Sequence, residues 1–438
     1  MDITTLNTQN LSRYAGASFQ CGCGVCHTVA TQSVVFGPSP SLETFFAPLL
    51  PSLGVVTVIS DAQIRDKTER AFEKRLSRAG YRVHTHTLET GSPASLETAA
   101  KVIVPEEAFL VAGAGGGTVA DLTKYVAAAK KLPCALILTS PAALGSLTPS
   151  AMLHSDGGVE EIYKTPPFSG VFCDMDFLTD LPPALIPAAF GELAAKAVSL
   201  FDYKFAHLIA GERFCPHLYE LGFAAIDETL ARFRDRVLGE KEAAAILAES
   251  SLRFSALGQL TGNSRLFCGG EAQAAHALRL LFKHEQRPLK LRGETEFLLS
   301  RIVLEVYKNF LARPANFFVP PPSNARRAEK ITEYLGVPEK TAIGKMRAIP
   351  SPEKLKLFSY RLNEYRDELY EAVCLNAVRL NRAWRVFKRL YPDDGFGLVN
   401  YIEPPDAALA LALAPDLKEK FTLLSFMKDA GLLDEHIR

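Results

Sequence analysis

Gly113, Gly115, Gly116 and Gly117 stand together in the stretch FLVAGAGGGTVADLTKYVAAA, between an apolar run and a pattern typical of a helix. Glycines allow positive φ angles and let backbone N–H groups approach an anion, because no Cβ stands in the way. A helix that begins near Thr118 would point the positive end of its dipole into this turn. The spacing differs from G-x-G-x-x-G. These residues predict a pyrophosphate-binding turn, with a tight turn that binds nothing as the alternative.

Asp61 is a second candidate for ligand binding, because it follows the apolar strand pattern VVTVI at 55–59. In an open α/β sheet, nucleotides lie at the carboxyl ends of the strands. Asp61 can accept hydrogen bonds from a ribose or an adenine group there. It can also cap the helix pattern that follows, and the two roles are compatible. An acidic residue at this strand end favours NAD over NADP.

A different chemistry is offered by the segment FQCGCGVCH, which holds Cys21, Cys23, Cys26 and His27. Thiolates and imidazole are the ligands that zinc prefers in proteins. The C-x-C-x-x-C-H spacing is tight, and no second Cys/His pair follows nearby. A surface turn rich in glycine and cysteine is therefore the favoured interpretation, and a metal site is the alternative.

The elements that must position these residues alternate between strand and helix patterns over 32–140. The expected strands include 55–59, 81–88, 109–112 and 134–138. Such alternation predicts a parallel sheet with helices between its strands. We therefore expect an α/β dinucleotide-binding domain over 1–180.

From about Leu181 the pattern becomes helical, with apolar residues at spacings of three and four. We expect an all-helical domain over 181–438, and a kink or connector at the proline-rich segment 320–322. Its apolar faces are sufficient for a homodimer.

Composition narrows the class of protein. The 438 residues are 48% hydrophobic, and 49 basic residues balance 49 acidic ones. Zero net charge argues against a nucleic-acid partner or a membrane-surface partner. The chain has no apolar run of about 18 residues and no signal-peptide pattern at its start. Eight scattered cysteines indicate reduced thiols and a cytoplasmic protein.

The order of motifs also resembles a known family. The G-x-G-G-G-T turn is followed by Asp121 and Lys124, then by G-E-x-x-x-K at 191–196, by G-G-E at 269–271 and by R-G-E at 292–294. Over most of its length the chain resembles the glycerol-1-phosphate dehydrogenase branch of the iron-containing alcohol dehydrogenase and dehydroquinate synthase-like superfamily. The resemblance implies that superfamily's fold, a nucleotide-binding α/β domain followed by an all-α domain.

The resemblance also implies a cofactor and a substrate. NADH or NADPH would lie across the glycine turn, with Thr118, Asp121 and Thr139 beside it. A divalent metal, zinc or iron, would polarise the carbonyl of dihydroxyacetone phosphate as a Lewis acid. Lys124 would bind the nicotinamide amide or the substrate phosphate. An ordinary exposed pair of Asp121 and Lys124 on a helix is the alternative.

The metal ligands depart from the family pattern. The carboxylate position falls on Glu192, Ala272 replaces the first histidine, and His276 occupies the later position. Arg292 replaces the remaining histidine, and an arginine cannot coordinate zinc, because it keeps its protons and has no free lone pair. A displaced metal would then rest on Glu192 and His276. Arg292 would otherwise act as a cationic electrophile, bind a phosphate or carboxylate, or pair with Glu192.

Three hypotheses for function stay open. The first is an NAD(P)-dependent dehydrogenase of the glycerol-1-phosphate type with an altered metal site, acting on a small phosphorylated substrate. The second is a metal-independent enzyme of the same fold. The third is a nucleotide-binding protein without catalysis. The first is favoured, because the cofactor half of the sequence keeps its motifs.

Overall fold

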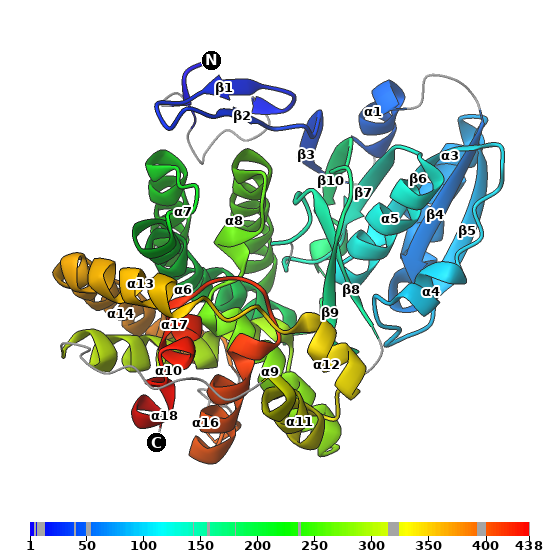
Figure 1. Ribbon diagram of the computed structural model, residues 1–438. Coiled ribbons are helices and arrows are strands. Elements are labelled where there is room, and N and C mark those ends of the chain that lie inside the picture. Colours follow the sequence, from blue (N-terminus) through cyan, green and yellow to red (C-terminus); the bar gives the residue numbers. More distant parts are fainter. Residues whose placement is uncertain are drawn as a thin grey trace. The chain divides into compact units, whose positions relative to one another are not determined.

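The computed structural model describes two units, each formed from several chain segments (Figure 1). The described residues are 1–3, 6, 14–38, 41–49, 54–142, 144–155, 158–179, 181–234, 238–313, 324–391 and 400–437. The first unit consists of Met1–Ser155, Glu160–Ala189 and Val237–Asn263. The second unit consists of Asp156–Val159, Phe190–Arg236 and Ser264–Arg438. The proline-rich segment at 320–322 lies outside the described residues.

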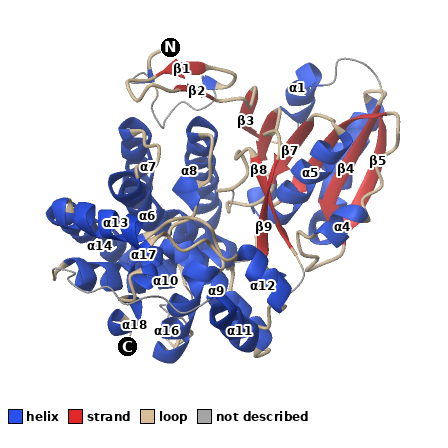
Figure 2. Cartoon of the chain, in the orientation of Figure 1, coloured by secondary structure: helices blue, strands red, loops and turns tan. Residues whose placement is uncertain are grey.

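The first unit is built on a parallel sheet of six strands (Figure 2). From one edge to the other, the strands are β3 (Ser33–Gly37), β10 (Gly170–Asp174), β7 (Cys134–Leu138), β6 (Ala108–Gly115), β4 (Val55–Asp61) and β5 (Arg82–Leu88). Every residue of β7 and β10 is buried, as expected for parallel strands that are covered on both faces.

Successive side chains of the inner strands enter two separate apolar cores. On one face, Ile137 of β7 belongs to a core with Phe46 and Phe72. On the other face, Leu136 belongs to a core with Leu122. This alternation follows from the two-residue period of a strand, and it explains why the strands read as continuous apolar runs.

Short helices and two hairpins complete the first unit. The helical segments are α1 (Leu42–Phe46), η4 (Ala47–Leu49), η5 (Ala62–Ile64), α2 (Arg65–Thr68), η6 (Glu69–Glu73), α3 (Lys74–Arg78), α4 (Leu96–Ala100), α5 (Gly117–Lys130), η8 (Phe177–Thr179) and α8 (Glu240–Thr261). The antiparallel hairpins pair β1 (Ser18–Gln20) with β2 (Cys26–Thr28) and β8 (Ser150–His154) with β9 (Glu160–Lys164).

The second unit is helical throughout its described residues. It contains most of α6 (Leu185–Ala210), then α7 (Pro216–Arg234), η9 (Arg265–Phe267), α9 (Gly270–His284), α10 (Arg292–Leu311), α11 (Asn324–Leu335), α12 (Glu339–Lys345), α13 (Pro352–Glu364), α14 (Arg366–Arg389), α16 (Pro404–Leu413), η10 (Ala414–Asp416), α17 (Leu423–Asp429) and α18 (Leu433–His436). Nearly all of α6 from Leu193 to Ala206 is buried, so this helix lies at the centre of the helical core.

The predicted fold class is confirmed, since a parallel α/β unit is accompanied by an all-helical one. The division of the chain differs from the predicted boundary at 180. The segments 181–189 and Val237–Asn263 belong to the first unit. The second of these segments contains α8, whose residues Ala248 and Leu252 enter the same core as Leu122 of α5. A helical pattern shows which face is apolar but not which partner covers it.

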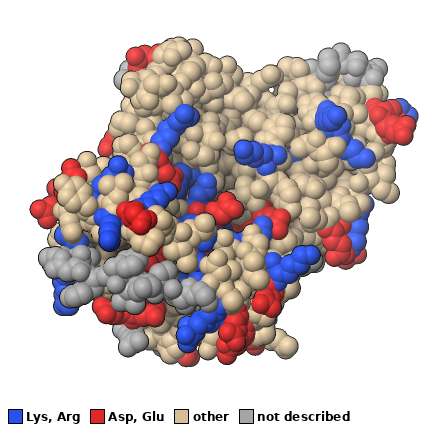
Figure 3. Space-filling view, in the orientation of Figure 1, with Lys and Arg blue, Asp and Glu red and all other residues tan. Residues whose placement is uncertain are grey.

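Charged side chains of both signs are intermixed on the face shown in Figure 3. Among the described helices, none combines sufficient length with sufficient hydropathy to cross a lipid bilayer.

Candidate functional site

The strand order of the first unit reverses between β4 and β6. The chain runs from β4 to the edge strand β5, then returns past β4 to β6 and continues to β7. In open α/β sheets, such a reversal opens a crevice at the carboxyl ends of the two strands. Ser60 of β4 pairs with Ala114 of β6, so the carboxyl ends of these strands lie side by side. Asp61 and the glycine turn are therefore brought to one edge of the sheet.

The N-terminus of α5 carries no side-chain cap. Gly116 is the N-cap residue, and it offers no side chain to the first N–H groups of the helix. A Cβ added at Gly117 would meet no atom within 4 Å, and both Gly117 and Thr118 are exposed. The first residues of a 14-residue helix are therefore exposed, without a side-chain cap, at the strand-order reversal. An anion would be stabilised at this position by the backbone N–H donors and by the helix dipole.

The glycines of the turn do not use the positive φ angles that their type allows, since none of the four adopts one. Two of them are required for close packing instead. A Cβ at Gly113 would lie 2.4 Å from Oγ1 of Thr123, and one at Gly115 would lie 2.4 Å from Cγ2 of Val119. These two glycines let α5 pack closely against the end of β6. Gly117 alone of the four would place a Cβ in open space.

Asp61 and Thr139 flank the turn with defined partners. Oδ1 of Asp61 accepts a hydrogen bond from the backbone N–H of Gln63 at 2.8 Å, so the capping role proposed from the sequence is confirmed. The backbone N–H of Thr139 donates to the carbonyl oxygen of Gly115 at 3.2 Å. This bond ties the end of β7 to the glycine turn. Roles of the two side chains in cofactor binding stay predictions.

Lys124 lies inside the first unit, with no exposed side-chain surface. Its Nζ donates to the carbonyl oxygen of Gly145 at 3.1 Å and to that of Ser150, and it lies 3.4 Å from Oδ1 of Asp121. Burial lowers the pKa of Lys124, and the charge of Asp121 opposes that shift. The pair is therefore not an ordinary exposed pair on a helix. These contacts anchor α5 to the segment 145–150, and the predicted contact with substrate stays a prediction.

The second unit contains a buried cluster of charges that the sequence analysis did not find. Nζ of Lys196 on α6 lies 2.7 Å from Oε2 of Glu296 on α10 and 3.2 Å from Oε1 of Glu271 on α9. All three side chains are at most 2% exposed. The hydroxyl of Ser199 donates to Oε1 of Glu271. Arg292 joins the cluster, because its Nε donates to Oε1 of Glu296 at 2.6 Å.

Two opposing effects set the protonation of this ionic cluster. Burial favours the neutral acid at Glu296, but Lys196 and Arg292 outweigh it and lower the pKa of Glu296. At Glu271, burial prevails over Lys196 and raises the pKa. The nearby carboxylates raise the pKa of Lys196, although burial alone would lower it. Glu296 is therefore the ionised partner of both cations.

The metal set expected from the resemblance is not assembled. Glu192 lies half-buried on α6, and His276 is buried on α9. Within the described part of the chain, neither residue belongs to a group of three or more His, Cys, Asp or Glu side chains with ligand atoms in mutual reach. The cation Arg292 is held instead against Glu296. The residues present do not fit the family's metal.

Another buried acid, besides Glu271 and Glu296, lies on α6. Asp202 on α6 accepts hydrogen bonds from the backbone N–H groups of Gly270 at 2.7 Å and Leu423 at 2.9 Å. The hydroxyl of Tyr307 also donates to it, at 3.1 Å. Burial outweighs these three bonds and raises the pKa of Asp202 to about 7. One signal in the sequence points to such residues, because Lys196 and Asp202 stand in a helix that is mostly apolar.

The N-terminal hairpin brings three of its four metal-ligand candidates together. The ligand atoms of Cys21, Cys23 and His27 lie within 4.8 Å of one another, while Cys26 is exposed and outside that group. The eight cysteines, all among the described residues, form no disulfide. The interpretation as a plain surface turn therefore does not account for this grouping.

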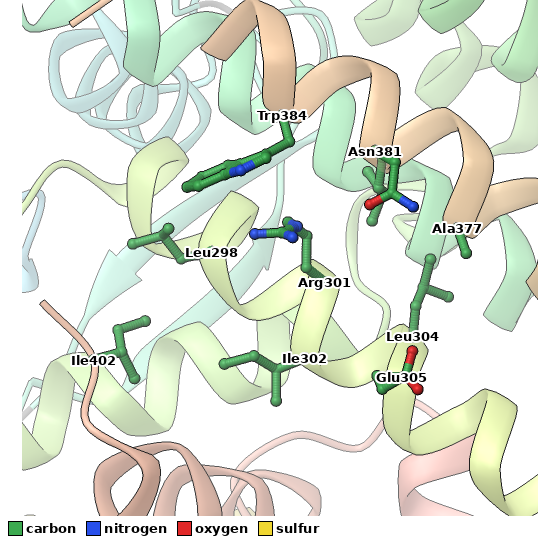
Figure 4. A pocket seen from close by; sticks show the side chains of 10 residues that line it. Leu298, Arg301, Ile302, Leu304, Glu305, Ala377, Asn381, Trp384 and Ile402 are labelled. Carbon is green, nitrogen blue, oxygen red and sulfur yellow. The ribbon is translucent and has the colours of Figure 1, made fainter. Parts of the chain in front are cut away.

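The second unit also has a cavity of about 450 Å³ between α10 and α14 (Figure 4). Leu298 and Ile402 contribute apolar lining, and Asn381 contributes an amide. The guanidinium carbon of Arg301 lies 4.3 Å from the ring centre of Trp384. Both side chains are labelled in Figure 4. None of the site residues expected from the sequence lines this cavity.

Comparison with known proteins finds relatives among alcohol dehydrogenases and glycerol-1-phosphate dehydrogenases. The family model for iron-containing alcohol dehydrogenase matches residues 40–182. A glycerol-1-phosphate dehydrogenase (NAD(P)+) of Geobacillus stearothermophilus is 23% identical over 360 residues, which cover 80% of this chain and 87% of that protein. Another, from Geobacillus thermodenitrificans (strain NG80-2), is 28% identical over 250 residues. That match covers 57% of this chain and 61% of the relative, so it spans less than two thirds of the relative's length.

Solved structures share the fold at low sequence identity. An archaeal alcohol dehydrogenase from a Red Sea brine pool has a TM-score of 0.58 at 13% identity, over 94% of this chain and 98% of that one. An iron-containing alcohol dehydrogenase from Corynebacterium glutamicum has a TM-score of 0.51 at 16% identity, over 94% and 96%. Residues 40–182 thus match the family model for iron-containing alcohol dehydrogenase, the chain shares the fold of solved alcohol dehydrogenases, and glycerol-1-phosphate dehydrogenases are among its distant relatives.

Proposed function

We propose that this protein is an NAD(P)-dependent dehydrogenase that interconverts a CH–OH group and a ketone. The proposed oxidised substrate is dihydroxyacetone phosphate or a related small phosphorylated ketone, in line with the names of the relatives. One observation carries the proposal: the uncapped N-terminus of α5 faces open space at the strand-order reversal of a parallel sheet. This is the arrangement with which open α/β sheets hold the pyrophosphate of a dinucleotide.

The chain's own residues suggest how the cofactor is held. The backbone N–H groups of Gly117 and Thr118 would bind the pyrophosphate, and Asp61 would face the ribose. When bound, the nicotinamide ring supplies or accepts the hydride. Arg65 is a candidate partner for the 2′-phosphate of NADP, but Glu73 engages its guanidinium at 2.7 and 3.0 Å. We therefore infer a preference for NAD(H).

The handling of the substrate carbonyl must differ from the metal-based scheme, because the ligand set does not fit a metal. A second candidate function follows from this disagreement: a metal-independent enzyme of the same fold. The observation that favours it is the position of Arg292, a permanent cation held against Glu296 where a ligand was expected. A guanidinium can bind a phosphate or stabilise negative charge that develops on a substrate oxygen. The third candidate, a nucleotide binder without turnover, shares the same cofactor site.

One set of measurements separates these functions. The purified protein is titrated with NADH and with NADPH, and oxidation of each is followed with dihydroxyacetone phosphate and a panel of phosphorylated ketones. The assay is repeated after chelator treatment. Turnover that survives the chelator and falls in Arg292→Ala supports the metal-independent enzyme. Turnover lost with the chelator and in Glu192→Ala supports a rebuilt metal site at Glu192.

Two further outcomes of the same measurements count against the proposal. Nucleotide binding without turnover on any ketone of the panel supports the non-catalytic binder. Failure to bind either nucleotide would overturn all three functions.

A further inference from the structure

The segment 21–27, which comprises the turn between β1 and β2 and the first two residues of β2, holds soft metal ligands that the proposed dehydrogenase chemistry does not use. Gly24 has a φ of +81° and its backbone N–H donates to the carbonyl oxygen of Cys21 at 3.0 Å. This tight turn folds Cys21 and Cys23 back toward His27. Glycine is needed at position 24 because a side chain would strain this left-handed conformation.

The pairing of the hairpin decides which residues meet. Gln20 pairs with Cys26, and Phe19 pairs with His27. Neighbouring side chains of a strand point to opposite faces, so His27 and Cys26 face opposite ways. His27 is buried, whereas Cys26 is exposed. The hairpin geometry therefore selects Cys21, Cys23 and His27 and excludes Cys26.

The tautomer of His27 is fixed by the helix next to it. Nδ1 of His27 lies 2.5 Å from the carbonyl oxygen of Leu260, in the last turn of α8. A carbonyl oxygen only accepts hydrogen bonds, so Nδ1 carries the proton. The lone pair is then on Nε2, which lies 3.3 Å from Sγ of Cys23. Histidines that bind metals are oriented in this way, with the second ring nitrogen donating to a carbonyl oxygen or carboxylate.

We propose that Sγ of Cys21, Sγ of Cys23 and Nε2 of His27 bind one zinc ion. Two thiolates and one imidazole form a mixed soft set that suits zinc, and a fourth donor would complete the tetrahedron. Binding replaces the two thiol protons by the metal, so two protons are released to solvent. The resulting unit of Zn²⁺ and two thiolates is neutral, which suits a half-buried position. No oxidant or reductant takes part.

The role of this site is to fasten the hairpin. Gln259, also in the last turns of α8, accepts bonds from the backbone N–H groups of Ala30 at 2.7 Å and Thr31 at 3.2 Å. Its amide also donates to Oγ1 of Thr31 at 2.7 Å. The contact of His27 with Leu260 also joins the hairpin to the last turn of α8. Zinc would lock the end of a hairpin whose strands are only three residues long.

The test is the metal content of the full-length protein by mass spectrometry, measured beside four variants. We expect about one zinc per chain in the wild type. Cys21→Ser and Cys23→Ser should bind zinc at least about tenfold more weakly. Cys26→Ser is the matched control from the same hairpin and should keep its zinc. Glu192→Ala should also keep it, because that residue lies outside the proposed ligand set.

Cobalt gives a second measurement that does not depend on activity. Replacement of the zinc by Co²⁺ should produce a thiolate-to-metal charge-transfer band in the near ultraviolet, present in Cys26→Ser and absent in Cys23→Ser. Far-ultraviolet circular dichroism of each variant shows whether it is folded. A serine scan over the remaining cysteines would then identify the fourth donor, if it is a thiolate.

Three outcomes would overturn the zinc site. One is a wild type that carries no zinc and gives no charge-transfer band with added Co²⁺. Another is a loss of zinc in Cys26→Ser as large as that in Cys23→Ser. The third is a metal that Cys23→Ser retains and Glu192→Ala loses, which would place it in the helical unit. Each outcome is independent of dehydrogenase activity, so it leaves the proposed function to its own test.

Discussion

Nε of Arg292 lies 2.6 Å from Oε1 of Glu296, one helical turn further along α10. Arg292, which stands where the resemblance predicts a metal ligand, is thus one of two cations on a buried carboxylate. The other cation, Lys196, contacts Oε2 of the same group. The negative charge of Glu296 is balanced from both sides by the protein.

Arg292→Ala should lower the free energy of unfolding by about 1 kcal/mol, because this side chain is 31% exposed and Glu296 keeps Lys196. Urea denaturation measures the change. Arg292→Lys is the matched variant, since it keeps the charge but not the planar fork. A loss above about 3 kcal/mol, the range for breaking a buried pair, would show that Arg292 is the main partner of Glu296.

Lys196→Met should destabilise the protein far more strongly, by about 3–5 kcal/mol, because it leaves Glu296 and Glu271 buried without their common cation. Lys204 on the same helix provides the control. It pairs with Glu368 at 2.7 Å, but its side chain is 24% exposed, so Lys204→Met should change stability by less than about 1 kcal/mol. Equal losses in both variants would contradict the assignment of a buried ionic core.

Two neighbouring glycines should respond differently to substitution. Gly115→Ala forces a Cβ against Val119 and should destabilise the protein by about 1–3 kcal/mol. Gly117→Asp places its side chain in open space at the start of α5, where a negative charge stabilises the helix by up to about 1 kcal/mol. The same charge would repel a pyrophosphate.

We therefore expect Gly117→Asp to keep the melting temperature and to weaken NADH binding at least about tenfold, equivalent to about 1.4 kcal/mol. Calorimetric titration and thermal melts measure the two quantities. Unchanged NADH affinity in this folded variant would mean that the dinucleotide binds elsewhere.

Asp202 should make stability depend on pH. Its pKa is raised to about 7 in the folded protein from an ordinary 3.8, mainly by burial. Between these values the native state holds a proton that the unfolded state has lost. The free energy of unfolding is therefore highest, as far as Asp202 decides it, at low pH. It falls as the pH rises toward 7, by up to about 1.4 kcal/mol per pH unit.

The Asp202→Asn variant tests this dependence. An amide keeps the size, but its NH2 group must face one of the two backbone donors, Gly270 or Leu423, so the variant should be less stable by about 1–3 kcal/mol. Its denaturation curves from pH 4.5 to 7.5 should show a flatter pH dependence than those of the wild type. Identical slopes would mean that Asp202 is already ionised at low pH.

In the first unit, the sequence predicted those elements whose bounds depend on the residues of one segment alone. The strand at 134–138 is β7 with the same bounds, and the helix after the glycine turn begins at Gly117, next to the predicted Thr118. The strand order places Asp61 beside the glycine turn. This position could be expected from the sequence, because ligands of open α/β sheets lie at the carboxyl ends of the strands.

The rest of the site depends on contacts between residues far apart in the sequence, which no local sequence pattern predicts. Glu271 and Glu296 are 75 and 100 residues from Lys196 along the chain, so their meeting needs the packing of three helices. Lys124 resembled an exposed helix residue, because its i, i+3 partner Asp121 is visible in the sequence. The carbonyl groups that hold it belong to a segment more than 20 residues away.

The attachment of α8 to the first unit makes the two halves of the chain inseparable as linear fragments. A protein cut after residue 189 would contain all six strands of the sheet but would lack α8, and with it the core contributed by Ala248 and Leu252. The same cut removes Leu260, the partner of His27. Expression of the α/β half alone would therefore yield an unfinished domain, and only the intact chain supplies its last helix.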